Sequence, residues 1–192
     1  MSLRGKAQFC SAKISVWWDL ENCHVPMGCD PDNIAQNIRS ALAKLNYCGP
    51  ITFSACGDCT RIPDDVHSAP FYTGIDLKHV PDGFNYASNK ILVDMLLWSV
   101  NNPAPANYLL ISEEMNFPYA LHQLRIRGYN ILLAHPQPIK ASSGLVDAAT
   151  YLWNWTSLVY GGLPENYISD AIQTSRIAES TTKSPKSSNN TI

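Results

Sequence analysis

The fold is decided by the stretch Ile14–Pro26, which reads ISVWWDLENCHVP. Its first five residues are mostly β-branched or aromatic, the composition of a strand that is buried on both faces of a sheet. Polar side chains follow at once in Asp19, Glu21 and Asn22. In an open α/β sheet, ligands bind beyond the carboxyl ends of the strands. We therefore expect a functional site at Asp19, with further parts contributed by the rest of the chain.

Strands and helices alternate along the chain after this first strand. The alternation predicts a three-layer α/β/α sandwich around a mostly parallel sheet with the strand order 3-2-1-4-5. Periodicity and turn residues place the later elements. Strands are expected at 51–56, 75–80, 108–111 and 130–134, and helices at 34–45, 87–100, 117–127 and 145–160.

Length and composition indicate one folded domain. The chain has 192 residues, of which 45% are hydrophobic, enough for a full core. Beyond Leu163 the composition shifts to Ser, Thr, Asn and Lys, which predicts a tail that is largely disordered. We expect an N-terminal extension at 1–11, a folded domain at 12–163 and the tail at 164–192.

Charge and cysteine usage restrict the setting. The net charge of -2 shows no basic excess, so nucleic-acid binding would need a local patch. No apolar run suits a signal peptide or a membrane span, and six cysteines then indicate reduced thiols. The sequence favours an intracellular, cytoplasmic protein that is neither secreted nor bound to a membrane. A structural zinc joining Cys56 and Cys59 to Cys23 and Cys29 is a weaker alternative.

A second polar cluster, Ser112-Glu113-Glu114-Met115-Asn116, follows the fourth predicted strand. Strands one and four are neighbours in the predicted order, so Asp19 and Glu114 are expected to lie close together. Converging carboxylates suit Mg²⁺ or Mn²⁺, which can polarise a phosphodiester and generate a hydroxide nucleophile. The alternative is that Asp19 only caps a loop.

The helix predicted from residue 87 adds a third set of polar groups. Lys90 near its start could pair with a phosphate, and Asp94 follows one turn later. The alternative interpretation is that Ser88 or Asn89 caps this helix and Asp94 is a solvated surface residue.

Four parts of the sequence share a family pattern: Val16–Asn22, Asn107–Ser112, Tyr119–Arg125 with Tyr129–Ala134, and Leu152–Leu158 with Gly161–Gly162. In this order they resemble the NYN domain, a PIN-like and Rossmann-like ribonuclease fold, and in particular the plant NYN proteins related to meiosis regulator and mRNA stability factor. The resemblance implies a metal-dependent endoribonuclease or an RNA-regulating module that binds Mg²⁺ or Mn²⁺. The few basic side chains of the chain would suffice for weak binding to single-stranded RNA. The resemblance implies a role in regulating gene expression and an association with peroxisomes.

The resemblance also implies roles for individual residues. Asp19, Glu114 and Asp94 would be metal ligands and catalytic residues. The residues expected to bind substrate are Asn22, Lys90, Ser112 and Asn116.

The second cluster departs from the family pattern Ser-Gly-Asp-x-Asp-Phe. Glu113 replaces the glycine, Glu114 the first aspartate and Asn116 the second. Fewer carboxylates bind metal less tightly. A catalytically inactive module that binds RNA or a partner protein is therefore the alternative, and a protein partner would supply targeting. A hydrolase of small phosphoesters is a third reading, disfavoured because no glycine-rich phosphate loop follows the first strand.

Overall fold

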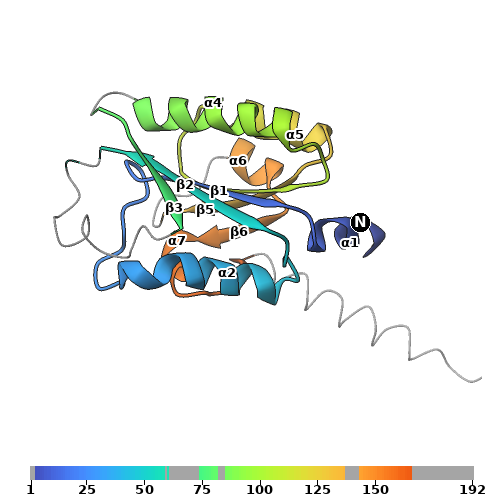
Figure 1. Ribbon diagram of the computed structural model, residues 1–192, viewed down its shortest axis with the longest axis horizontal. Helices are drawn as coiled ribbons and strands as arrows, with labels where there is room; N and C mark the ends of the chain where they lie inside the picture. The colour runs from blue at the N-terminus through green and yellow to red at the C-terminus, as the bar shows by residue number, and fades with distance from the viewer. Residues whose placement is uncertain (1–2, 59, 61–73, 82–84, 137–142, 166–192) are drawn as a thin grey trace, which may run out of the picture.

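Figure 1 shows a computed structural model of the chain, which describes residues 3–58, 60, 74–81, 85–136 and 143–165. Six strands form one sheet in the order β3-β2-β1-β4-β5-β6, and all neighbouring pairs are parallel. The predicted α/β class and the predicted order of the first five strands are confirmed. The strands are β1 Ile14–Asp19, β2 Ile51–Gly57, β3 Ile75–His79, β4 Asn107–Ile111, β5 Asn130–His135 and β6 Tyr151–Asn154.

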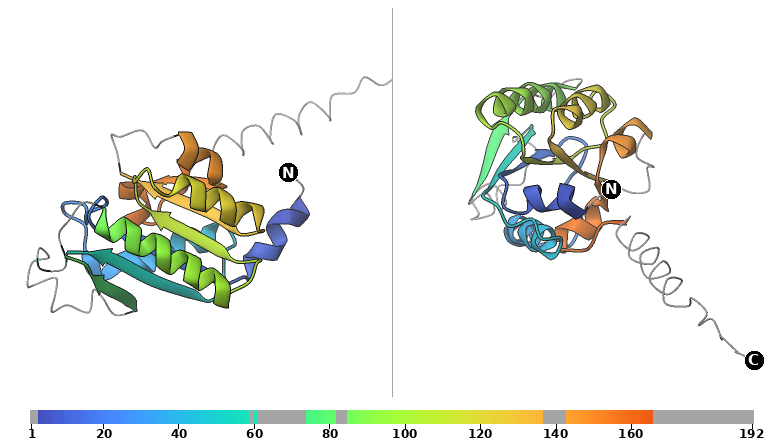
Figure 2. Two further views of the ribbon diagram at one scale, coloured as in Figure 1. Left: turned by 90° about the horizontal axis from the view of Figure 1, so that it is seen from above. Right: turned by 90° about the vertical axis from the view of Figure 1, so that its right-hand side faces the viewer.

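Helices cover both faces of the sheet, which makes the three predicted layers (Figures 1 and 2). One face packs against α2 and α7, and the other against α4, α5 and α6. No helix in the described ranges is long and apolar enough to cross a membrane. The helices are α1 Leu3–Cys10, the 3₁₀ turn η1 Pro31–Asn33, α2 Ile34–Lys44, α4 Tyr86–Asn101, α5 Pro118–Ile126, α6 Ser143–Ala148 and α7 Trp155–Val159.

β1 lies at the centre of the sheet, and every one of its residues is buried. Val16 and Trp18 pack into the layer of α2 and α7, whereas Trp17 packs into the layer of α4. Side chains alternate between the two faces of a strand, so a strand covered on both sides is apolar at most of its positions. This requirement explains the mostly apolar composition that identified β1 in the sequence.

The single helix predicted at 145–160 is wrong. The structure has α6, then β6 paired with β5, then α7. Tyr151 and Trp153 are buried while the residues after each are half-buried, which is the two-residue period of a strand. Asn154 then caps α7 by accepting a hydrogen bond from the Ser157 amide. Trp153 and Trp155 therefore both pack in the core, in two different elements.

Two other expectations have mixed outcomes. On α4, Ile91 and Met95 are buried as predicted, but Leu96 is 43% exposed. Ser88 and Asn89 do not cap this helix, because it begins at Tyr86 with Asn85 as its N-cap. The predicted tail at 164–192 lies outside the described residues from 166 onward.

A buried amide network joins α1 to the sheet at the amino ends of the strands. Asn107 on β4 is fully buried and donates to the Phe9 carbonyl oxygen at 3.0 Å. Its own side-chain oxygen accepts from Asn130 Nδ2 at 2.9 Å, and Thr150 donates to Asn130 Oδ1 at 2.8 Å. These side chains connect β4, β5 and the approach to β6 to the segment that precedes β1.

Candidate functional site

Asp19 lies at the carboxyl end of β1 and is completely buried. Its Oδ1 atom accepts hydrogen bonds from the amides of Glu21 at 3.1 Å and Asn22 at 3.3 Å. Its Oδ2 atom accepts from Asn22 Nδ2 and from Ser112 Oγ, both at 2.8 Å. A carboxylate offers about four lone-pair sites, so the two oxygens of Asp19 are fully hydrogen-bonded.

The bond from Ser112 joins the two polar clusters. Ser112 follows β4, which pairs directly with β1, and its side chain is fully buried. The Glu114 amide donates to Ser112 Oγ at 3.1 Å, which fixes the start of the loop after β4. The clusters that the sequence places after strands one and four therefore meet, with Ser112 as the direct contact.

The pKa of the Glu113 carboxyl group is raised by burial, and the charge of Asp19 is one of the further causes. Burial raises the pKa of the Glu113 carboxyl group, and the charges of Glu114 and Asp19 raise it further, while His135 opposes them. Glu113 Oε2 is a buried oxygen without a hydrogen-bond partner among the described residues. Asp19 and Glu113 also both raise the pKa of the buried Cys23 thiol, after burial itself. Glu113 thus lies on the Asp19 side of the loop.

Asn116 connects this loop to the start of α4. Its Nδ2 atom donates to Ser88 Oγ at 3.1 Å and to Asn89 Oδ1 at 3.2 Å. Ser88 in turn donates to the Asn85 carbonyl oxygen at 3.2 Å. The amide of Asn116 therefore holds the β4–α5 loop against the first turn of α4.

Asp94 is held by two lysines. Lys78 on β3 donates to it at 2.8 Å, and Lys90, one turn earlier on α4, donates at 2.9 Å. Partial burial alone would raise the pKa of Asp94, but the hydrogen bonds and charges of both lysines outweigh this effect and keep the pKa below its usual range. Asp94 is therefore an ionised carboxylate that is already neutralised by cations.

The three carboxylates predicted as metal ligands are not grouped. Within the described residues, no three or more His, Cys, Asp or Glu side chains lie close enough together to hold a metal ion. Asp19, Glu114 and Asp94 therefore form no such set, and the oxygens of Asp19 are occupied. The arrangement does not fit a bound Mg²⁺ or Mn²⁺ without displacement of Asn22 or Ser112 from Asp19.

A zinc site built from cysteines has no support in the described part of the chain. Cys23 and Cys56 are both buried. Cys23, Cys29 and Cys56 belong to no group of three or more metal-binding side chains among the described residues. Cys59 lies outside the described residues.

Sequence reasoning missed two parts of this site. Lys78 was given no role, because its contact with Asp94 depends on the packing of α4 against the sheet edge. Glu113 was considered only as a replaced glycine. The signal available in the sequence was the position of Glu113 shortly after the strand that neighbours β1. Adjacent residues there point in different directions, so Glu113 and Glu114 were not equivalent candidates.

A family model for the NYN domain matches residues 13–155, which is most of the chain and includes both polar clusters. The chain belongs to the NYN domain family. The NYN match extends from the residue before β1 to the first residue of α7. It therefore includes all six strands of the sheet.

Curated relatives of this NYN domain from different animals have the same name. This NYN domain is 28% identical over 141 residues to "Meiosis regulator and mRNA stability factor 1" of Mus musculus, a match that covers 72% of this chain and 8% of the mouse protein. The protein of the same name from Xenopus tropicalis is 26% identical over 157 residues, covering 81% of this chain and 9% of that protein. The NYN chain thus spans less than a tenth of the length of these relatives.

A solved structure supports the fold. A Vibrio parahaemolyticus protein of unknown function superposes with a TM-score of 0.52 at 14% identity. The match covers 74% of this chain and 91% of that one. At this identity the likeness concerns the fold alone.

Proposed function

We propose that this NYN domain binds single-stranded RNA and regulates gene expression through that binding. Family membership supports an RNA-related role, as does the name of the relatives, which describes mRNA stability. Lys90 is exposed at the start of α4, and Lys78 lies beside it through their shared contact with Asp94. A few cations of this kind are enough for weak, salt-sensitive binding to a single strand.

The observation that favours binding over cleavage is the state of the carboxylates. Asp19 is saturated by four donors and Asp94 is neutralised by two lysines. Each would have to lose existing hydrogen bonds before it could hold a cation. Binding of a phosphate by Lys90 requires no such rearrangement, because an ammonium group has three donors and can keep its contact with Asp94.

The test is RNA binding without metal. Fluorescence anisotropy of labelled oligouridine and oligoadenine is measured with the full chain in EDTA. We expect binding that Lys90→Ala weakens and that Lys44→Ala leaves unchanged, since Lys44 lies on α2 at the opposite face and donates to the Gly161 carbonyl oxygen. No anisotropy change up to the solubility limit of the protein would exclude the proposed function.

A metal-dependent endoribonuclease, with one or two Mg²⁺ or Mn²⁺ ions, is the second candidate. It is favoured by the Glu113 carboxyl oxygen, which is buried without a partner beside Asp19. Its ligands would be Asp19, Glu114 and Asp94, which would have to move together, because they form no metal-binding group among the described residues. Calorimetry with each metal, and cleavage of single-stranded RNA by the natural chain against Asp19→Asn, decide it. Metal binding and cleavage that both disappear in Asp19→Asn would establish this activity over simple binding.

Targeting and location are further parts of the proposal. We propose an intracellular, cytoplasmic protein directed to its RNA by a protein partner, with a peroxisomal association implied by the resemblance. Affinity capture with the full chain, with and without ribonuclease treatment, separates a direct protein partner from proteins that are bridged by RNA. Fluorescent tagging at either end reports the compartment.

A further inference from the structure

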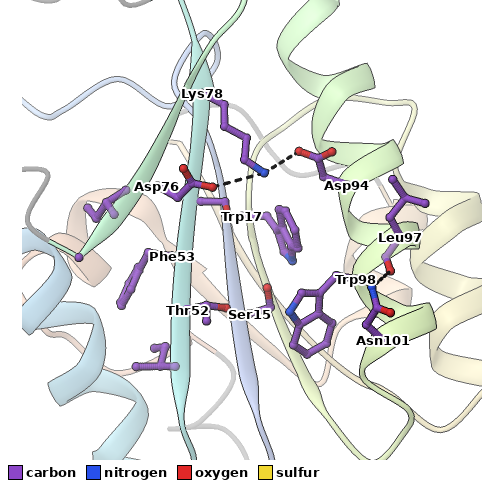
Figure 3. Close-up of a pocket in the computed structure, with 14 residues that line it drawn as sticks. Ser15, Trp17, Thr52, Phe53, Asp76, Lys78, Asp94, Leu97, Trp98 and Asn101 are labelled. Atoms are coloured by element: carbon purple, nitrogen blue, oxygen red, sulfur yellow. Dashed lines mark hydrogen bonds and ion pairs between the residues drawn. The ribbon is translucent and has the colours of Figure 1, made fainter.

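A groove of about 670 Å³ lies between α4 and the strands at the β3 edge of the sheet (Figure 3). Its rims come from different elements. Asp76 and Lys78 belong to β3, and Asp94, Leu97 and Trp98 belong to α4. The volume is in the range of small-molecule sites in proteins.

The floor of the groove is polar although it faces a helix. Ser15 on β1 is paired in register with Thr52 on β2, and Trp17 is paired with Ser54. These side chains share the α4 face, since Trp17 packs in the α4 layer and strands alternate. The inner strands of parallel sheets are normally apolar on both faces, so small hydroxyl side chains here leave space that larger apolar residues would fill.

Trp17 supplies an unused hydrogen-bond donor at this floor. The residue is only 3% exposed, and its Nε1 atom has no hydrogen-bond partner among the described residues. Figure 3 shows the nitrogen at the end of the indole that points toward Trp98. A buried N–H without a partner costs folding free energy. An acceptor on a ligand in the groove would satisfy this N–H.

The charges beside the groove do not select an anion. Lys78 is the cation at the rim, and it is bound by Asp94 at 2.8 Å and by Asp76 at 3.5 Å. Its ammonium group also lies 5.8 Å from the centroid of the Trp17 ring. A phosphate inside the groove would meet two carboxylates, so the lining suits a neutral ligand.

The aromatic parts suit a flat ligand. Trp98 is half-buried and is held edge-on against Tyr108, with ring centroids 5.1 Å apart. The Tyr108 hydroxyl donates to the Met95 carbonyl oxygen at 3.0 Å, which fixes that ring in turn. Bases of single-stranded RNA stack on aromatic side chains and carry the carbonyl oxygens and ring nitrogens that accept hydrogen bonds.

We propose that this groove takes one unpaired base of a bound RNA strand, with Trp17 Nε1 donating to the base and Trp98 packing against its face. The inference rests on the proposed RNA-binding function. Lys90 and Lys78 share Asp94, so the phosphate-binding end of α4 is continuous with the groove rim. A strand whose phosphates lie at Lys90 can thus direct a neighbouring base into the groove.

The direct test observes the Trp17 indole N–H by nuclear magnetic resonance. The full chain labelled with ¹⁵N is titrated with uridine and adenosine monophosphates and, separately, with oligouridine and oligoadenine. Trp17→Phe assigns the resonance. We expect the Trp17 signal to move with the oligonucleotides, and the mononucleotide arm shows whether a base alone suffices.

A filled groove provides the binding test. Ser54→Leu places a larger side chain on the floor and should weaken RNA binding by roughly tenfold, the order of one lost base–aromatic contact. Thr52→Leu is a second filling variant in case Ser54→Leu unfolds. Thr156→Leu, an exposed position on α7 at the opposite face, is the matched control and should bind normally. Thermal unfolding of each variant confirms that it is folded.

The outcomes separate this inference from the proposed function. One outcome is that RNA binds while the Trp17 signal does not move and both filling variants keep their affinity. That outcome would contradict base binding in the groove and would leave the proposed function unaffected. A Trp17 shift with mononucleotides but no binding of oligonucleotides would overturn both the RNA role and the strand-bound base proposed here. A Trp17 shift with oligonucleotides, lost in Ser54→Leu, supports the inference.

Discussion

Asp19 is a carboxylate whose present contacts serve the structure. Its four hydrogen bonds join the loop after β1 to the loop after β4, so one side chain fixes the edge where the two central strands end. Any ligand of Asp19 must compete with these donors. The Asp19 oxygens that hold the two loops together are therefore the same atoms that a ligand would have to bind.

Replacement of Asp19 by alanine should therefore destabilise the fold. The change leaves Ser112 and the Asn22 side chain as donors without an acceptor, at a cost of about 2 kcal/mol in the free energy of unfolding. Urea denaturation measures this loss. Glu114→Ala is the control, with an expected change within about 0.5 kcal/mol. Equal stability of Asp19→Ala and the natural chain would show that these bonds do not hold the loops.

Glu113 should make stability depend on pH in the opposite sense to a salt-bridged carboxylate. Its pKa is raised in the folded protein, chiefly by burial, so the folded state binds its proton more readily than the unfolded state does. Its contribution is most favourable below the unfolded pKa and is lost as pH rises through the folded-state pKa. Glu113→Gln should raise the melting temperature at pH 7 by about 2 °C.

The matched measurement for Glu113 is made at acidic pH in EDTA. At pH 4 or below, both states of the natural chain carry a largely protonated Glu113, so the advantage of Glu113→Gln should shrink toward zero. Glu114→Gln controls for the general loss of a negative charge. An advantage that is equal at both pH values would contradict the assigned cause.

Among the elements, those whose residues follow one simple burial pattern were predictable from the sequence. β1, β4 and β5 are buried on both faces and show as mostly apolar runs, and α2 shows the helical spacing of Ile34, Ile38 and Leu42. β6 was missed because four residues are too few to separate a strand from the helix that starts at Trp155. The contacts of Asp94 were not predictable, because Lys78 reaches it only through packing of α4 on the sheet edge.

Asn107 should control the attachment of α1. Asn107→Ala removes the donor to the Phe9 carbonyl oxygen and leaves the Asn130 amide without its acceptor, which should cost about 2 kcal/mol. Hydrogen exchange should speed up in α1 and the residues before β1 more than in α2. Asn37→Ala is the comparison, since Asn37 on α2 donates to the Val159 carbonyl oxygen on α7, away from α1. Uniform loss of protection across the chain would contradict a local role for Asn107.

For the whole molecule, the charge balance limits RNA affinity. The net charge is -2, and the lysines near the candidate site are shared with carboxylates. The place where an RNA strand binds must then depend on where individual lysines lie, because the molecule as a whole does not attract a polyanion.

The salt dependence of RNA binding should be shallow. Contacts to two or three phosphates give a slope of log affinity against log salt of about -1.5 to -2 for a single strand. Lys90→Ala should reduce the steepness by about 0.7, the share of one phosphate contact. Anisotropy titrations at several salt concentrations measure both slopes. A slope unchanged in Lys90→Ala would remove this lysine from the phosphate contacts.

Trp18 and Trp155 make the fold visible to optical spectroscopy. Their ring centroids lie 5.0 Å apart at an interplanar angle of 55°, and Trp155 Nε1 donates to the His24 carbonyl oxygen at 2.8 Å. Two indoles that are close and not parallel couple their electronic transitions, which produces a pair of circular dichroism bands of opposite sign. One ring comes from β1 and the other from α7, so this signal exists only while these two elements, distant in the sequence, remain packed together.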